Sequence, residues 1–290
     1  MGRKQSKNNR WKIQLLATLA SNPFFLHFPL GKLYRGPLKG VCVPGLNCYS
    51  CPAAAGSCPI GSLQAVIGSP KYQVSFYVLG ILTLLGTLLG RAVCGFLCPF
   101  GWFQELLHKI PTKKFSTRPL HILTYLKYGV LILFVIVLPM TVVNEVGLAA
   151  PFFCQYLCPV GILEGGIPLS LANESIRASL GILFTWKSCL LLGVVTLSIF
   201  FYRPFCKWLC PLGALYALFN KLSLSRLHID TAKCTSCGVC SRVCKMDVDV
   251  FHHTNHTECI RCGDCIRACP HHAIQSSTLF RNISKKESEL

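Results

Sequence analysis

Three long apolar runs dominate the pattern of hydrophobic and polar positions along this 290-residue chain. They cover residues 72–93, about 124–143 and about 182–202. A helix of about 20 apolar residues crosses the ~30 Å hydrocarbon core of a bilayer, so each run predicts a membrane span. Lys127 and Lys187 lie toward the ends of their runs, and we expect both to extend their ammonium groups to the bilayer surface.

A fourth apolar run, 13–30, is weaker because Asn22, Pro23, His27 and Pro29 interrupt it. We still expect it to span, which predicts a mainly α fold with a polytopic transmembrane domain of about four spans. The short basic segment before this run leads into it without an A-x-A-like cleavage site, so we expect an anchor rather than a cleaved signal.

The distribution of basic residues predicts the orientation in the membrane, because cytoplasmic segments carry the excess of Lys and Arg. If both termini are inside, the inner segments 1–12, 91–119 and 203–226 carry 5, 5 and 4 basic residues. The outer segments 31–71 and 141–179 then carry 4 and 1. This bias predicts cytoplasmic N- and C-termini.

The composition indicates a membrane protein rather than a nucleic-acid-binding protein. The chain is 52% hydrophobic and only 14% charged, with a mean hydropathy of +0.48. Its formal charge of +18 is explained by basic residues at the ends of the spans. We therefore expect a multi-pass protein of the cell membrane, surrounded by the lipid bilayer and without a nucleic-acid partner.

The character of the chain changes after residue 222. Residues 223–280 are polar, rich in cysteine and histidine, and contain no run long enough to span. We expect a transmembrane domain over 1–222, a small α+β domain over 223–280 at the cytoplasmic face, and a flexible tail over 281–290.

Eight of the 19 cysteines form two copies of one motif, C-x2-C-x2-C-x3-C. The segment "CTSCGVCSRVC" contains Cys234, Cys237, Cys240 and Cys244. The segment "CIRCGDCIRACP" contains Cys259, Cys262, Cys265 and Cys269. In this spacing the first three thiolates bind one [4Fe–4S] cluster, and the fourth binds the neighbouring cluster.

This rule predicts two crossed ligand sets in the C-terminal domain. The first cluster is expected on Cys234, Cys237, Cys240 and Cys269. The second is expected on Cys259, Cys262, Cys265 and Cys244. Gly238 and Gly263 allow the backbone to wrap closely around each cluster. Two zinc sites are the competing interpretation, but zinc ligand pairs are usually separated by a longer spacer.

The segment therefore resembles a bacterial-type two-[4Fe–4S] ferredoxin domain. Because each cluster already has four cysteines, we expect the histidines around the motifs to be exposed polar residues rather than ligands. These are His252, His253, His256, His271 and His272.

A second motif, C-x3-C-P, recurs in the membrane part. It appears as "CGFLCPFGWFQ" from residue 94, "CQYLCPVGILE" from 154 and "CKWLCPLGALY" from 206, with a partial copy, "CPIGSLQ", from 58. A C-x3-C pair at a helix end places both thiols on one face, and the proline suits the first turn of the next helix. That turn also offers free N–H groups that stabilise thiolates. Metal ligation explains these repeated pairs better than simple packing of buried cysteines.

The predicted topology assigns the copies to the two membrane faces. The inner-face set is Cys94, Cys98, Cys206 and Cys210, with Arg91 and Arg203 each three residues before a cysteine pair. These arginines either raise the potential of a cluster or mark the lipid boundary. For the outer face we expect Cys58, Cys154, Cys158 and Cys51, with Cys42 and Cys48 also candidates.

Two alternatives remain for the outer face: Cys42, Cys48, Cys51 and Cys58 form a site of their own, or two of them form a disulfide. We thus expect one or two iron–sulfur clusters beyond the two of the C-terminal domain, with iron bound through these cysteines. The remaining cysteine, Cys189, lies within a span, and we expect it to pack in the interior.

With these motifs on nearly its full length, the chain resembles the NapH/NosR-type membrane polyferredoxins. The resemblance implies an electron-transfer component that links membrane quinols, or another redox partner protein, to a reductase or maturation system. Two features depart from the family pattern. No flavin-binding extracytoplasmic domain of the NosR kind fits in 290 residues, and the loop 42–61 is richer in cysteine than the plain NapH pattern.

We expect an electron relay between a membrane or extracytoplasmic donor and a cytoplasmic-side partner. One alternative is a quinol dehydrogenase subunit, which would make the protein an enzyme and would need a proton acceptor beside an apolar pocket. The candidates are Glu105, His108, Glu145 and Glu164. Another alternative is a maturation or metal-handling factor that supplies electrons for assembling another protein's metal site.

Overall fold

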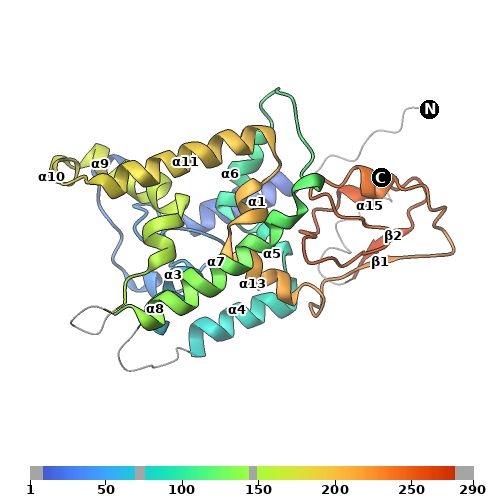
Figure 1. Cartoon of the computed structure of the whole chain (residues 1–290), viewed down its shortest axis with the longest axis horizontal. Helices are drawn as coiled ribbons and strands as arrows, with labels where there is room; N and C mark the ends of the chain where they lie inside the picture. The colour runs from blue at the N-terminus through green and yellow to red at the C-terminus, as the bar shows by residue number, and fades with distance from the viewer. Residues whose placement is uncertain (1–8, 69–75, 144–148, 278–290) are drawn as a thin grey trace.

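The computed structural model describes residues 9–68, 76–143 and 149–277, and within them the chain forms an elongated helical body with the C-terminal segment at one end. We call this end, which carries residues 226–277, the near end (orange to red in Figure 1), and the opposite end, which carries the helices around residues 167–178, the far end. Glu145 and the predicted tail over 281–290 lie outside the described residues.

The helices follow one another along the whole described chain, and the two strands both belong to the near end. In chain order the elements are α1 (Arg10–Ser21), α2 (His27–Leu30), η1 (Pro37–Gly40), α3 (Pro59–Ile67), α4 (Phe76–Leu89), α5 (Ala92–Phe96), α6 (Pro99–His108), η2 (Arg118–Tyr125), α7 (Leu126–Val130), η3 (Leu131–Val137), α8 (Leu138–Thr141), η4 (Phe153–Leu157), η5 (Gly161–Gly166), α9 (Ile167–Ala172), α10 (Glu174–Ala178), α11 (Ile182–Phe200), α12 (Pro204–Trp208), α13 (Pro211–Phe219), β1 (Leu227–Ile229), α14 (Val239–Arg242), α15 (Asp264–Ala268) and β2 (Ile274–Ser276).

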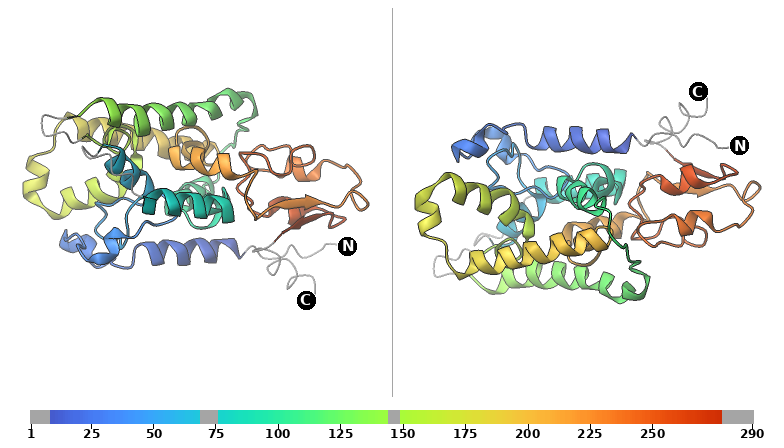
Figure 2. Two further views of the ribbon diagram at one scale, coloured as in Figure 1. Left: turned by 90° about the horizontal axis from the view of Figure 1, so that it is seen from below. Right: turned by 90° about the horizontal axis from the view of Figure 1, so that it is seen from above.

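Two helices of the described chain are long and apolar enough to cross a membrane. One is the continuous helix Arg118–Thr141, which comprises η2, α7, η3 and α8, and the other is α11. They lie on the opposite side of the body from α1 (Figure 2). Only 28% and 17% of their apolar windows are buried, so their side chains mostly face outward, unlike those of the core helix of a soluble protein.

The first predicted span is wrong as a continuous helix. Helix α1 ends at Ser21 and contains 12 residues, which extend about 18 Å. Asn22 leaves the helical conformation, with φ −131° and ψ 63°, because the ring of the following Pro23 disfavours helical geometry before it. Of the predicted run 72–93, the structure describes α4, which ends just before Gly90 with its left-handed φ of +54°.

Three short stretches have wide π-helical turns, and each ends two residues before a proline. They are η3, η4 and η5, and the prolines that follow are Pro139, Pro159 and Pro168. Proline has no N–H to donate and its ring displaces the carbonyl of the preceding turn, which favours local widening of the helix. One of these stretches, η4, contains Cys154, and η5 follows Cys158, so this C-x3-C-P copy lies within disrupted α-helix.

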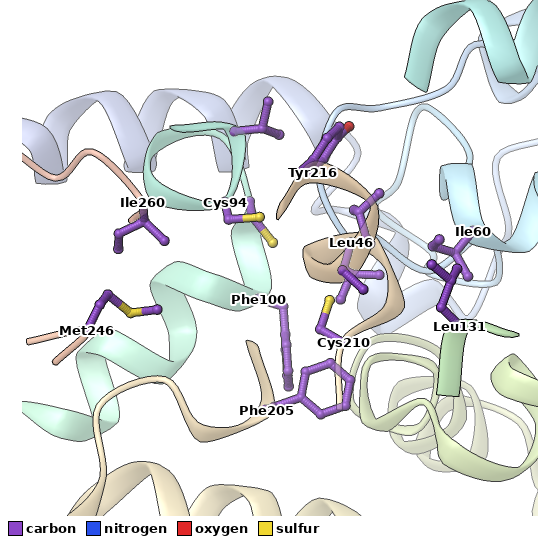
Figure 3. Close-up of a cluster of buried hydrophobic side chains, with 14 of the residues drawn as sticks. Leu46, Ile60, Cys94, Phe100, Leu131, Phe205, Cys210, Tyr216, Met246 and Ile260 are labelled. Carbon is purple, nitrogen blue, oxygen red and sulfur yellow. The ribbon is translucent and has the colours of Figure 1, made fainter. Parts of the chain in front are cut away.

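The near end is a small α+β unit packed directly against the helical body. Strands β1 and β2 pair antiparallel, with Leu227 opposite Ser276 and Ile229 opposite Ile274, and α14 contacts α15. One continuous hydrophobic core joins this unit to the body. In Figure 3 Ile260 of the near end faces the body beside Cys94. This shared core fixes the position of the C-terminal cysteines relative to those of the body.

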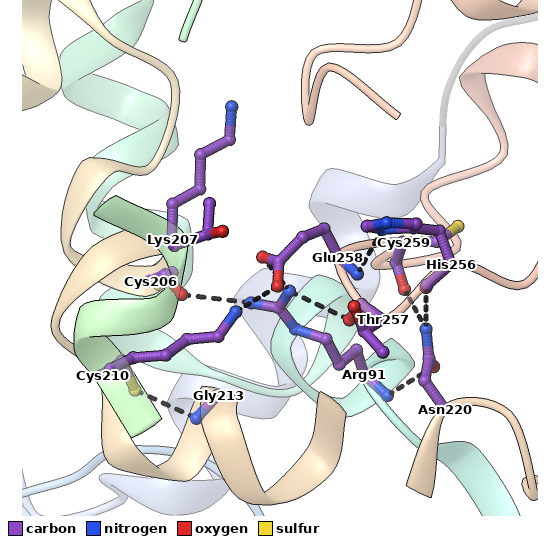
Figure 4. Close-up of polar contacts among 12 residues, drawn as sticks. Arg91, Cys206, Lys207, Cys210, Gly213, Asn220, His256, Thr257, Glu258 and Cys259 are labelled. Carbon is purple, nitrogen blue, oxygen red and sulfur yellow. Dashed lines mark hydrogen bonds and ion pairs between the residues drawn. The ribbon is translucent and has the colours of Figure 1, made fainter. Parts of the chain in front are cut away.

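A buried ion-pair network also ties the near end to the body (Figure 4). Glu258 pairs with Arg91, at 2.5 Å, and with Lys127. Both cationic side chains are fully buried, and Asn220 extends the network by donating to the carbonyl oxygens of His256, at 2.6 Å, and Cys259, at 3.0 Å. The prediction that Lys127 reaches the bilayer surface is therefore wrong. Burial raises the pKa of Glu258, but the two cations outweigh it and hold that pKa at about 2.

We expect Glu258→Gln to destabilise the docking of the near end on the body. The substitution leaves two buried cations without their shared carboxylate, and breaking a buried pair in this way costs about 3–5 kcal/mol. The measurements are the midpoint of thermal unfolding and the rate at which trypsin releases the C-terminal fragment. Glu174→Gln is the matched control, because Glu174 is exposed and forms a surface ion pair with the exposed Arg177. Equal behaviour of the two variants would contradict this role of Glu258.

Candidate functional site

The near end brings the first predicted ligand set to one small cavity. Its lining contains the three leading cysteines of the first motif and the fourth cysteine of the second, which are Cys234, Cys237, Cys240 and Cys269. Gly238, with φ +67°, directly precedes α14 and lines this cavity. The backbone N–H of Ala273 donates to the thiol of Cys269 at 3.4 Å, as a thiolate ligand would require.

The second predicted set is also brought together, with the motifs crossed as expected. Burial, and then the neighbouring thiols of Cys262, Cys259, Cys244 and Cys240, raise the pKa of Cys265. Gly263, with φ +82°, directly precedes α15 at this site. Cys244 interacts with both Cys259 and Cys265, so it lies near the second motif.

Two C-x3-C-P copies meet at a buried four-cysteine site, which we call the near site: Cys94, Cys98, Cys206 and Cys210. All four side chains are buried. Burial, and then Cys206 and Cys94, raise the pKa of Cys98 to about 12. Burial and the other three thiols raise the pKa of Cys210 well above its usual value. In Figure 3 Cys94 and Cys210 lie on either side of Phe100, and Phe205 lies below Cys210; the two phenylalanines come from α6 and α12.

The proline of each copy begins a helix immediately after the second cysteine, as the motif predicts. Pro99 is the first residue of α6, and Pro211 is the first residue of α13. The first turn of α13 directs a free backbone N–H of Gly213 to the thiol of Cys210, at 3.3 Å. Helix starts thus supply hydrogen-bond donors to sulfur at this site.

The arginine that precedes each C-x3-C-P copy contacts the other copy of the near site. Arg91, from the first copy, donates to the carbonyl oxygen of Cys206 in the second at 3.1 Å. Arg203, from the second copy, donates to the carbonyl oxygen of Cys94 in the first at 2.5 Å. Both guanidinium groups are fully buried, so they contact the protein interior beside the thiols rather than a lipid boundary.

The glycine of each C-P-x-G segment leaves space for the arginine that comes from the other copy. A Cβ atom added at Gly101 would lie 3.0 Å from Arg203 Nη1, and one added at Gly213 would lie 3.4 Å from Arg91 Nη2. The first of these contacts is tighter than van der Waals packing allows without movement. Glycine at this position therefore lets the partner copy's arginine pass close to the backbone, and a side chain at Gly101 would force Arg203 to move.

Glu105, one of the four candidate proton acceptors, is held in an ion-pair network. It pairs with Arg203 at 3.1 Å and with Arg10, and it accepts from Tyr202. Burial raises its pKa, but Arg203 and Arg10 outweigh this and lower the pKa to about 2. Such a carboxylate is a poor proton acceptor at neutral pH.

A second four-cysteine group, which we call the far site, lines a cavity of about 620 Å³: Cys48, Cys58, Cys154 and Cys158. Burial, and then the thiols of Cys154, Cys58 and Cys48, raise the pKa of Cys158 well above its usual value. The structure thus brings Cys48 to this site, whereas we expected Cys51.

Cys51 and Cys42 do not line the far-site cavity. The thiol of Cys51 lies 3.7 Å from Asn22 Oδ1, and that of Cys42 lies 3.7 Å from both Ser57 and Ser62. All 19 cysteines are free thiols in this structure. The separate site over the loop cysteines is therefore not the arrangement that the structure forms.

A lysine at the far site has the position that an arginine has at the near site. Lys187 donates from Nζ to the carbonyl oxygen of Cys154 at 3.1 Å, the same distance that joins Arg91 to Cys206. A Cβ atom added at Gly161 would lie 3.2 Å from this Nζ and 3.9 Å from the thiol of Cys48. Lys187 therefore faces the cysteines, and the prediction that it reaches the bilayer surface is wrong.

The loop that supplies Cys48 runs between the two sites. A Cβ atom at Gly45 would lie 2.7 Å from the Cα atom of Cys98, so this loop touches a near-site cysteine. Glu164 accepts from the backbone N–H of Cys48 at 2.8 Å, and burial raises the pKa of Glu164 to about 8. The sequence signal for Cys48 is weak, since the partial copy has Ala54 where its first cysteine would stand.

The donor sets fit clusters better than single metal ions. Among the residues that the structure describes, no three Cys, His, Asp or Glu side chains are close enough to hold one metal ion. A cubane attaches each thiolate to a different iron, so its ligands are spaced more widely than those of zinc. Of the histidines near the motifs, His252, His253, His271 and His272 are exposed and His256 is half-buried. Cys189 is exposed on α11, so its predicted packing in the interior is wrong.

Comparison with protein families agrees with this geometry. A family described as "4Fe-4S binding domain" matches residues 72–118, 126–167 and 183–230, and each match contains one full C-x3-C-P copy. A second family with the same description matches residues 253–275, which contain the second ferredoxin motif. The chain therefore carries 4Fe-4S binding domains in both its membrane part and its C-terminal part.

The chain is similar over most of its length to several curated proteins. An uncharacterized protein of Methanocaldococcus jannaschii is 27% identical over 82% of this chain and 85% of its own length. The methylamine utilization ferredoxin-type protein MauN of Methylorubrum extorquens is 25% identical, covering 81% and 74%. The ferredoxin-type protein NapH of Haemophilus influenzae is 24% identical, covering 80% and 71%.

Regulatory proteins named NosR match a shorter part of the chain, and no solved structure matches it. These comparisons confirm the resemblance to NapH/NosR-type polyferredoxins and support [4Fe–4S] clusters as the cofactors.

Single cysteine variants test the ligand sets. We expect Cys98→Ser and Cys210→Ser to remove the same EPR signal from the reduced protein, because both thiols belong to the near site. Cys189→Ser is the control and should retain every signal, because this exposed cysteine belongs to no set. If Cys98→Ser and Cys210→Ser remove different signals, the two copies do not share a site.

The far site is tested by a matched pair of variants. Cys48→Ser should remove a second signal together with Cys158→Ser, whereas Cys51→Ser should retain it. Loss of that signal in Cys51→Ser and its retention in Cys48→Ser would instead make Cys51 the fourth ligand, as expected from the sequence.

Proposed function

We propose that this NapH/NosR-type polyferredoxin relays electrons across a membrane through four iron–sulfur sites. Its relatives include ferredoxin-type proteins, and the chain shares their 4Fe-4S binding domains. The single observation that carries the proposal is the near site, which gathers four buried cysteines from two copies more than a hundred residues apart and lies against the C-terminal unit. Bound [4Fe–4S] clusters exchange one electron at a time without making or breaking bonds in a substrate.

The ligand sets that we propose follow the four groups of cysteines. In the C-terminal unit they are Cys234, Cys237, Cys240 and Cys269, and Cys244, Cys259, Cys262 and Cys265. In the membrane part they are the near site and the far site. The cations beside them offset the negative charge that four thiolates bring into a low-dielectric interior. They are the buried Arg91 and Arg203 and the half-buried Lys187.

Contacts between neighbouring sites indicate the order of the sites along the relay. A Cβ atom at Gly95 would lie 2.5 Å from the carbonyl oxygen of Ile260, so helix α5, which carries Cys94, touches the residue after the ligand Cys259. The far site touches the near site through the loop at Gly45. Cys237, which belongs to the first ferredoxin ligand set, is exposed. We therefore propose the order far site, near site, second ferredoxin site and first ferredoxin site, with a redox partner docking beside Cys237.

The topology that we propose has four spans with cytoplasmic termini. The helix Arg118–Thr141 and α11 supply two spans, and the shorter apolar helix α4 supplies a third. The fourth crossing consists of α1 and the interrupted segment that follows Ser21. Large apolar side chains stay exposed on these helices, among them Leu84, Ile132 and Leu192, as expected for contact with lipid. The near end then faces the cytoplasm, and the far end faces the other side.

Proteoliposomes test the relay directly. With a membrane-impermeant reductant supplied only at the far end, we expect the wild-type protein to reduce an acceptor enclosed at the near end. Cys98→Ser should slow this transfer by at least about tenfold because it interrupts the chain of sites, whereas Cys189→Ser should leave the rate unchanged. Equal rates in the two variants would contradict a relay through the near site.

An apolar cavity favours quinol oxidation as a second candidate function. A cavity of about 200 Å³ between the two sites is lined by aromatic and aliphatic side chains, including Phe100, Trp102 and Leu163, together with the polar groups Thr18 and Glu164. Apolar walls with a few convergent polar groups suit the ring of a quinol.

A bulky substitution in this cavity distinguishes quinol oxidation from electron relay alone. We expect Leu163→Trp to lower the rate at which menaquinol reduces the clusters, while dithionite still reduces them fully. Leu84→Trp, at an exposed position on α4, is the control. If Leu163→Trp leaves the menaquinol rate unchanged, the cavity is not a quinol site.

A further inference from the structure

Two buried glutamines have the same position in two of the cysteine repeats. Gln104 on α6 and Gln64 on α3 each stand six residues after the cysteine that precedes the proline. Their side chains are 0% and 1% exposed. Contacts within its own repeat do not account for the position of either glutamine. Each side chain also reaches the other repeat of its site.

At the near site Gln104 contacts both a backbone group and a thiol of the partner copy. Its Oε1 accepts from the backbone N–H of Phe205 at 3.2 Å, and its Nε2 donates to the thiol of Cys206 at 3.1 Å. The same Nε2 also lies 3.4 Å from the carbonyl oxygen of Phe100, four residues earlier on α6.

At the far site Gln64 makes the same three contacts. Its Oε1 accepts from the backbone N–H of Phe153 at 2.9 Å, and its Nε2 donates to the thiol of Cys154 at 3.3 Å. The third contact is again to the carbonyl oxygen four residues earlier, that of Ile60, at 3.3 Å. The same three contacts thus occur at two sites whose surroundings differ, which indicates that the two glutamines have the same role.

The backbone N–H fixes which end of each amide faces the sulfur. An N–H can only donate, so it must meet Oε1, and the NH2 group is then directed at the thiol. A neutral thiol is a weak acceptor and gains little from such a donor. A thiolate bound to iron carries negative charge, and a donor to its sulfur stabilises the site most when an added electron makes that charge larger.

We propose that Gln104 and Gln64 are positioning residues that set the reduction potentials of the near and far sites by donating an amide N–H to one cysteine ligand of each. This inference rests on the proposed function, since it requires clusters at both sites. The other two repeats differ at the equivalent position: Glu164 accepts from the backbone of Cys48, and Tyr216 donates to the carbonyl oxygen of Pro44. Each site therefore has one such amide donor to sulfur, supplied by one of its two repeats.

Redox titration followed by EPR tests the proposal on the full-length protein. Gln104→Met keeps the length of the side chain and removes the donor, so the near-site signal should shift to a lower midpoint potential while the far-site signal stays in place. Gln64→Met should do the reverse. Each variant thus serves as the control for the other, and the iron content of both should equal that of the wild type.

A second substitution distinguishes loss of the hydrogen-bond donor from a change in the shape of the side chain. Gln104→Glu retains an oxygen for the N–H of Phe205 but presents the second oxygen to Cys206, so it should lower the near-site potential at least as far as Gln104→Met. If either variant loses iron, the other still measures the potential.

Three results would overturn the inference: unchanged potentials, equal shifts of both signals in one variant, or loss of iron in every variant of a site. A wild-type protein with signals only from the C-terminal unit would instead contradict the proposed function, and this outcome is seen before any variant is made.

Discussion

Burial of four thiolates at one point in a low-dielectric interior is the constraint on which the rest of this structure depends. The buried thiols have raised pKa values, as for Cys98 and Cys154, both at about 12, so the protein interior alone would keep them protonated. Iron ligation, buried cations and N–H donors must together stabilise the charged form. The helix starts, the exchanged Arg91 and Arg203 and the two glutamine amides all meet this requirement.

Two different pairs of repeats meet the constraint in the same way. At each membrane-part site a cation from elsewhere in the chain binds the carbonyl oxygen of a cysteine, a glycine makes room for it, and a glutamine crosses from one copy to the other. The far site is the less regular copy, because Cys48 from a loop replaces a cysteine that the partial repeat lacks. Its cavity and its three partly exposed cysteines, Cys48, Cys58 and Cys154, suit the end of a relay, whereas the enclosed near site suits its interior.

Much of this arrangement could be predicted from the sequence because regular spacing fixes it. The crossed C-terminal sets follow from the ferredoxin spacing, and the near site follows from two repeats placed on the same face by two apolar runs. The positions of single residues could not be predicted in the same way. Lys127 and Lys187 looked like bilayer-surface lysines, since their partners Glu258 and the carbonyl of Cys154 lie far away in the sequence. Cys48 has no motif of its own, and Pro23 ends a helix that hydrophobicity alone would continue.

The most direct test of the central idea is the iron and acid-labile sulfide content of the full-length protein purified without oxygen. Four cysteine sets, each holding a [4Fe–4S] cluster, predict about 16 iron and about 16 sulfide per chain. About 8 of each would confine the clusters to the C-terminal unit and would contradict iron–sulfur sites at the paired C-x3-C-P repeats.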